Sequence, residues 1–196
     1  MPETLEKLQA RLAEIETQIE AEWDKRRAEM RYHLERRKIV FDQGIKDAHR
    51  QMRVRWSTFL RRTRPMVVLT APVIYSVVIP LALLDLFVTL YQWICFPIYG
   101  IAKVRRGDYI VIDRQNLAYL NAIQKFNCVY CGYGNGVIAY AREVAGRTEK
   151  FWCPIKHAHR VKGTHRYYGE FPEFGDAKAY REQSDRLREE LRNPPE

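Results

Sequence analysis

Residues 66–102 read MVVLTAPVIYSVVIPLALLDLFVTLYQWICFPIYGIA. Only one acidic or basic side chain, that of Asp85, occurs in these 37 residues. A helix crosses the hydrocarbon core of a bilayer, which is roughly 30 Å thick, with about 20 apolar residues. Because the stretch is longer than this, the sequence predicts a membrane-embedded segment.

Two arrangements of this segment fit its prolines. Pro80 divides it into two apolar halves, and proline bends or breaks a helix because it lacks an amide hydrogen. In the first arrangement, residues 66–79 and 81–102 form a membrane hairpin. In the second, one kinked helix crosses at about 76–98, and packing at the membrane surface or inside the protein is a third alternative. Basic residues on both flanks favour the hairpin, with both termini on the cytoplasmic side of an inner, cytoplasmic-type membrane.

The formal net charge is +9, and the positive charge brackets the apolar segment. Bases outnumber acids 14 to 4 over residues 25–64 and 12 to 5 over residues 103–170. Such flanks are typical of attraction to anionic lipid headgroups. Nucleic acid is a weaker alternative because no recognisable nucleic-acid-binding module accompanies the charge. We predict these residues at the membrane interface: Arg55, Trp56, Arg61, Arg62, Arg64, Trp93, Lys103, Arg105 and Arg106.

Asp85 has two interpretations. Intramembrane acids are rare and often functional, which makes Asp85 a possible polar site for an ion or a proton. The alternative is structural, either a residue of the hairpin turn or an interhelical hydrogen bond with Tyr75 or Thr89. The absence of a second intramembrane charge in the sequence favours the structural interpretation.

Residues 1–65 predict a long helical arm with a possible break near Gly44. Its basic part, 50–64, suits the headgroup region of a membrane. Over residues 5–19 the apolar spacing of three and four is that of a coiled coil. The arm is expected to associate with itself or with a partner helix, or else to pack on its own second domain. The residues with this spacing are Leu5, Leu8, Leu12, Ile15 and Ile19.

Residues 103–170 predict a small α+β or α domain, followed by a charged helical tail over 171–196. We expect a helix over 114–126, a tight turn near 128–132 and a second short helix over 135–147. The tail is expected to hold a solvated helix at about 176–192.

The small domain carries Cys-x2-Cys, followed after 21 residues by Cys-x3-His. Two cysteines in a tight turn, and a third one helical turn before a histidine, suit a tetrahedral Zn²⁺ site of Cys3His type. An iron or iron–sulfur centre, a redox dithiol and metal-free buried cysteines are the alternatives. The predicted ligands are Cys128, Cys131, Cys153 and His157, with His159 as an alternative fourth ligand.

Together these patterns predict a mainly α membrane protein without catalytic activity. A zinc-stabilised cytosolic domain would hold or recruit other proteins at the membrane. The alternative is a membrane-bound redox or electron-transfer protein that uses Cys128, Cys131 and Cys153. The weakest interpretation is an enzyme with an open-site zinc near His157 or His159. It needs a positioned acid or base, and Glu143 and Glu149 are the only candidate carboxylates near that part of the sequence.

Overall fold

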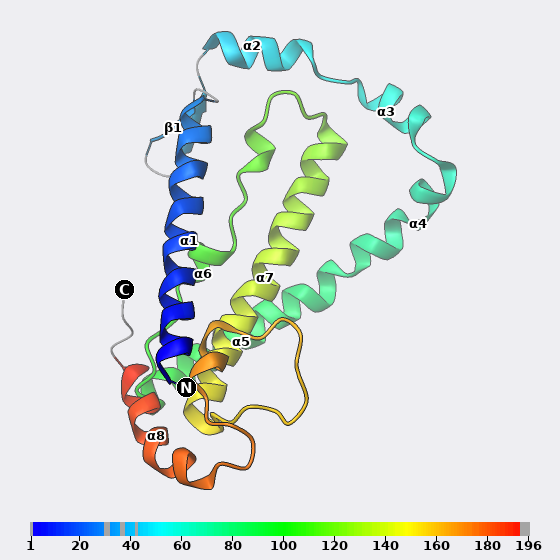
Figure 1. Cartoon of the computed structure of the whole chain (residues 1–196). Coiled ribbons are helices and arrows are strands. Elements are labelled where there is room, and N and C mark those ends of the chain that lie inside the picture. The colour runs from blue at the N-terminus through cyan, green and yellow to red at the C-terminus, as the bar shows by residue number, and fades with distance from the viewer. Residues whose placement is uncertain (1, 30–31, 36–37, 42, 193–196) are drawn as a thin grey trace. The chain divides into compact units, whose positions relative to one another are not determined.

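The computed structural model describes residues 2–29, 32–35, 38–41 and 43–192. These residues are mostly helical, as the sequence predicts (Figure 1). Their contacts group into two units, which are described separately. The first unit comprises the chain up to Arg61 together with Asp113–Lys125, and the second comprises Arg62–Ile112 and the chain from Phe126 onward.

The first unit contains two paired strands where the sequence predicted continuing helix. Strands β1 (Tyr32–Glu35) and β2 (Lys38–Phe41) pair in antiparallel register, with Tyr32 opposite Phe41. The run Ile39-Val40-Phe41 explains the difference, because β-branched and aromatic residues favour strands. The helices are α1 (Pro2–Glu29), α2 (Gln43–Gln51), α3 (Trp56–Arg62, which ends in the second unit) and the 3-10 turn η1 (Arg114–Asn116).

The predicted membrane segment begins the second unit as two consecutive helices, α4 (Pro65–Ser76) and α5 (Val78–Tyr99). Only Val77 separates them, and its φ of −63° and ψ of −18° are helical. Pro65–Tyr99 is therefore one apolar helical stretch of 35 residues, and its most apolar window of 18 residues has a mean hydropathy of 2.4. By length and composition it is able to cross a membrane.

The predicted reversal at Pro80 is wrong. Pro80 is the third residue of α5, in the first helical turn, where an amide hydrogen has no intrahelical partner to lose. The proline is accommodated there by a one-residue interruption, so the chain continues in the same direction and forms no hairpin.

Helix α7 (Ala122–Trp152) lies parallel to α4 and α5. Hydrogen bonds join Tyr75 to Asn127, Asp85 to Tyr133 and Gln92 to Tyr140, so the partners advance together along both helices. The returning connection contains the short helix α6 (Arg106–Tyr109). The core of this unit is formed by Phe96, Ile101, Val104, Tyr140, Val144 and Leu191.

Helix α7 is continuous through residues 128–132, where the sequence predicted a turn. Its glycines permit close packing instead. A Cβ atom on Gly136 would lie 2.8 Å from the Cα of Ile110, and one on Gly134 would lie 3.1 Å from the Cδ1 of Leu81. The glycines therefore have a tertiary role, which local sequence patterns do not reveal.

The C-terminal part contains the 3-10 turn η2 (Arg166–Glu170) and helix α8 (Ala177–Glu190), close to the predicted bounds. The tail is not simply solvated, because Leu187 and Leu191 are buried. The backbone amide of Ala102 also donates to the carbonyl of Leu191 at 3.0 Å. No separate small domain spans 103–170 among the described residues, since 113–125 belong to the first unit.

Candidate functional site

Helix α5 has an apolar outer face and a more polar inner face. Asp85, Gln92 and Phe96 are buried, and their spacings of seven and four place them on one side of the helix. A helix of a water-soluble domain has the reverse arrangement, with apolar residues inside and polar residues outside. The large apolar residues exposed on the other side are Leu83, Leu84, Leu86, Phe87, Leu90, Trp93, Ile94 and Ile98.

Asp85 lies in an ion pair on the inner face. Its two carboxylate oxygens accept hydrogen bonds from Nε and a terminal nitrogen of Arg106, at 2.8 and 2.5 Å. Tyr133 donates to the same carboxylate at 3.0 Å, and Thr89 donates at 3.4 Å. Thr89 is thus a partner of Asp85, but within α5 rather than between two helices as predicted, and Tyr75 bonds Asn127 instead. Because its partners come from this protein, Asp85 is held structurally within the fold.

The side chain of Gln92 hydrogen-bonds the segment that follows α5 and so holds it against this helix. Its side-chain amide donates to the Val104 carbonyl at 3.2 Å, and its oxygen accepts from the Val104 amide at 2.9 Å. The same amide group lies 2.5 Å from the hydroxyl of the buried Tyr140 on α7. Two neighbouring segments thus satisfy one buried polar side chain.

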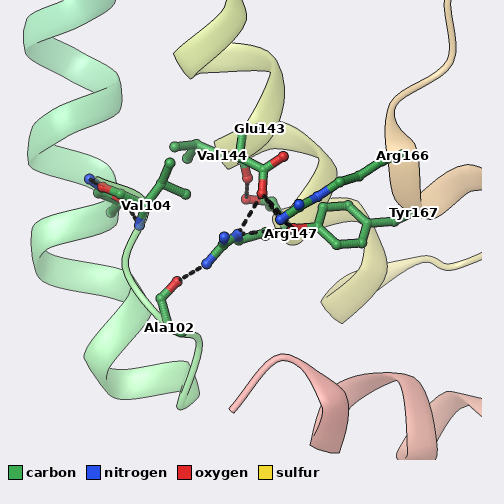
Figure 2. Close-up of polar contacts among 9 residues, drawn as sticks. Ala102, Val104, Glu143, Val144, Arg147, Arg166 and Tyr167 are labelled. Carbon is green, nitrogen blue, oxygen red and sulfur yellow. Dashed lines mark hydrogen bonds and ion pairs between the residues drawn. The ribbon is translucent and has the colours of Figure 1, made fainter. Parts of the chain in front are cut away.

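A cluster of buried charges lies further along α7 (Figure 2). The Glu143 carboxylate accepts hydrogen bonds from Arg147 at 2.9 Å, Arg166 at 2.7 Å and Tyr167 at 2.5 Å. Arg147 also donates to the carbonyl of Ala102 at 2.6 Å. The cluster joins α7, η2 and the connection that follows α5, so it fixes three parts of the second unit together.

The surroundings of Glu143 lower its pKa below the ordinary value. Burial alone disfavours the carboxylate and would raise the pKa. Hydrogen bonds from Tyr167 and Arg147 and the charge of Arg166 act in the opposite direction and prevail. Tyr167 has a raised pKa because it is buried and donates to this carboxylate. Glu143 is therefore an ionised hydrogen-bond acceptor at neutral pH.

A pocket of about 440 Å³ lies beside this cluster. Lys150 is buried in its wall and donates to Glu170 at 2.6 Å and to Glu190 at 2.7 Å. The wall holds three cations, Arg147, Lys150 and Arg166. They pair with three carboxylates, those of Glu170, Glu190 and the adjoining Glu143. The pocket is lined by Arg147, Lys150, Arg166, Tyr167, Glu170, Glu190 and Leu191. Its charges neutralise one another, which suits a role in holding α8 and η2.

The predicted metal ligands lie apart from one another. Cys128 and Cys131 are both within α7, whereas Cys153 directly follows its last residue. At 1.5 Å of rise per residue, about 30 Å separates Cys131 from Cys153 along the helix. His157 and His159 lie in the loop beyond, where the His157 backbone amide donates to the Tyr168 hydroxyl at 2.7 Å. Among the described residues, no group of three or more His, Cys, Asp or Glu side chains is placed to hold a metal ion.

The same helix limits the redox chemistry of Cys128 and Cys131. Cβ atoms three residues apart on a helix are about 5–6 Å apart, whereas a disulfide needs about 3.5–4.5 Å. A disulfide between these cysteines would require α7 to open locally. The zinc site and the redox alternative both stay predictions that need an arrangement other than this one.

The predicted interface residues fall into two sets. Arg55, Trp56 and Arg61 are exposed in the first unit. In the second unit, Arg62, Arg64, Lys103 and Arg105 are exposed, while Arg106 is bonded to Asp85. Lys103 places its ammonium group 5.9 Å from the ring centre of Trp93, at the edge of the apolar outer face.

Four polar residues of the interior were not predicted from the sequence, namely Gln92, Arg147, Lys150 and Tyr167. One signal was present, since Glu143, Arg147 and Lys150 are spaced by four and three and so share one helix face. Comparisons with protein-family models, with curated proteins and with solved structures found no match for this chain.

Proposed function

We propose that this protein is a non-catalytic scaffold that is anchored at a membrane through α4 and α5 and holds or recruits other proteins there. The reversed polarity of α5 carries the proposal. Its polar side chains are satisfied inside the protein, and its apolar side chains point outward. A continuous apolar surface of this kind marks a site of contact with lipid or with another protein.

The energetics favour lipid as the contact. Removing a large apolar side chain from water contributes about 1.5–3 kcal/mol. The outer face of α5 presents eight such side chains, and α4 adds Met66, Val67, Val68, Leu69, Val73 and Ile74. Even partial immersion of this surface contributes on the order of 10 kcal/mol, enough for stable attachment.

The packing of the second unit favours a helix that lies along the membrane surface. The segment after α5 has irregular backbone and exposed Lys103, Arg105 and Asp108, yet it packs on the inner face of α5. An upright helix would carry these groups into the hydrocarbon core, where exposed charges and unpaired backbone groups are costly. With α5 lying flat, its outer face enters the lipid and the charged segment stays in water.

Zinc remains part of this proposal only as a separate expectation. A cytosolic metal site formed by Cys128, Cys131, Cys153 and His157 would require α7 to break between its cysteines. The scaffold function does not depend on it, because the buried ion pairs and the apolar core already join the elements of the second unit.

Flotation with lipid vesicles tests the anchoring. The purified chain is mixed with phosphatidylcholine vesicles, with and without phosphatidylserine, and then centrifuged through a density gradient. We expect the chain to float with both kinds of vesicle, and more completely with the anionic ones at low salt. A chain that stays at the bottom with both would overturn the proposal.

The flat orientation is tested in sealed inside-out vesicles prepared from producing cells. A variant that retains Cys153 as its only cysteine is treated with a membrane-impermeant maleimide, and the arm is probed with protease. We expect both to be accessible from the same side. Accessibility of Cys153 and the arm from opposite sides would establish that Pro65–Tyr99 crosses the membrane.

A further inference from the structure

Helix α1 presents an apolar stripe that the described residues leave uncovered. Leu8, Leu12, Ile15 and Ile19 have exposed fractions of 60, 60, 46 and 44 %. Their spacing of four, three and four places them on one face of the helix. Arg11 and Glu16 are also exposed, on either side of this stripe. We propose that α1 forms a parallel, two-stranded coiled coil with a second copy of this chain.

The heptad positions identify the second copy as the occupant. With Leu12 and Ile19 at position a, and Leu8 and Ile15 at position d, Arg11 takes position g and Glu16 takes position e. In a parallel pair, a g residue faces the e residue five positions later on the other helix. Arg11 of each copy therefore meets Glu16 of the other, which gives two symmetric ion pairs.

These two residues are poorly placed to satisfy each other within one helix. Side chains three or four positions apart are neighbours on a helix, and Arg11 and Glu16 are five apart. Their complementary charges thus favour a second copy in parallel register. An antiparallel pair would instead place g opposite g and e opposite e, which does not bring Arg11 to Glu16.

The apolar seam is short, so the coiled coil is expected to need the membrane to bring two chains together. After Ile19 the next d and a positions are Glu22 and Arg26, which lie 3.5 Å apart in an exposed ion pair on the same helix. About two apolar heptads form weak dimers in free solution. Two chains held at one membrane have a high effective concentration, so the inference rests on the proposed anchoring for its stability.

Charge exchange tests the inference in the full chain. Copies labelled at the N-terminus with a donor or an acceptor dye are bound to vesicles at low surface density, and energy transfer is measured. We expect strong transfer for the wild type, because parallel helices bring the N-termini together. R11E and E16R each create like-charge contacts and should weaken association about tenfold. The double variant R11E/E16R should restore it.

Two further variants test whether the effect is specific to the seam of the coiled coil. E20R carries the same charge change as E16R at position b, away from the seam, and should leave energy transfer unchanged. I15K places a charge in the seam and should abolish transfer. Single exchanges with no effect, a double variant as weak as the single ones, or no transfer in the wild type would overturn the parallel coiled coil. Flotation of the same samples isolates the proposed function, because a failure of anchoring removes the chain from the vesicles.

Discussion

Helices α5 and α7 lie parallel in one unit, yet they distribute their polar residues differently. Helix α5 is apolar outside and turns Asp85 and Gln92 inward. Helix α7 buries charges, with Glu143 and Arg147 among its least exposed residues. The interface that these helices share with their neighbours thus buries polar and charged groups beside its apolar core, whereas the outward surface of α5 is apolar.

This difference separates two sources of stability. The polar interior of the second unit is stabilised by paired charges and hydrogen bonds that fix how its elements fit together. The outer face of α5 contributes little until something covers it. In the proposed function a membrane supplies that cover, so the two helices are expected to respond very differently to substitution.

The largest effect is expected on the outer face of α5. Introducing F87K and L90K together places two charges in the apolar surface, and each charge costs about 2.5–3.5 kcal/mol in the middle of a bilayer. We expect vesicle binding to weaken about 1,000-fold or more, since a shallow helix bears part of that cost. Flotation measures the loss. E182K and D185K on the exposed side of α8 serve as controls, and equal losses in both pairs would contradict a specific role of α5.

A smaller effect on stability is expected from the α7 cluster. Arg147 and Arg166 both donate to Glu143, but their side-chain exposures are 10 and 60 %. R147Q removes a buried cation and should lower the free energy of unfolding by about 3 kcal/mol. R166Q should cost about 1 kcal/mol or less, because solvent already screens that pair. Chemical denaturation in detergent measures both values, and a reversed order would contradict the burial of Arg147.

The pH dependence of stability should reflect Glu143. Its pKa in the folded chain lies below the ordinary value of 4.5. The stabilisation is therefore complete above pH 4.5 and is lost as the pH falls through the lower, folded-state pKa. Thermal unfolding between neutral and acidic pH should show this decrease, and E143Q should flatten it. If the stability of E143Q falls as steeply at acidic pH as that of the wild type, the decrease comes from other carboxylates.

The smallest effect is expected from removal of metal. Because α7 holds Cys131 and Cys153 about 30 Å apart, we expect a mild chelator to leave the unfolding temperature unchanged. We also expect metal analysis to find less than one zinc per chain. One tightly bound zinc that disappears in C153S would favour the Cys3His site predicted from the sequence, and it would require a break in α7.

The sequence was informative where one physical effect dominates. The apolar composition of 66–102 predicted the long apolar helices, because hydropathy acts locally. The two faces of α5 were also accessible in principle, since Asp85, Thr89 and Gln92 are spaced by four and three. This pattern places the polar groups of the segment on one side of a helix.

Tertiary packing decided the features that local sequence patterns do not reveal. The stretch CVYCG at 128–132 was predicted to form a turn, yet it lies within α7, where the following Gly134 and Gly136 allow close neighbours. The turn was the basis for bringing Cys128 and Cys131 to one ion, so the helix also changes the geometry of the predicted site. The Glu143 cluster combines residues from α7 and η2, and such a meeting of distant segments leaves no local signature.

The ion pair of Asp85 has a consequence for the order in which the chain is synthesised. Arg106 follows Asp85 by 21 positions, and Tyr133 follows it by 48. At about 5–20 residues per second, the ribosome adds Arg106 roughly 1–4 s after Asp85 and Tyr133 roughly 2–10 s after it. The apolar helix is thus made before Arg106 and Tyr133, the partners of its only carboxylate that lie outside the helix. Nascent chains are expected to meet the membrane first and to close the polar interior of the second unit afterwards.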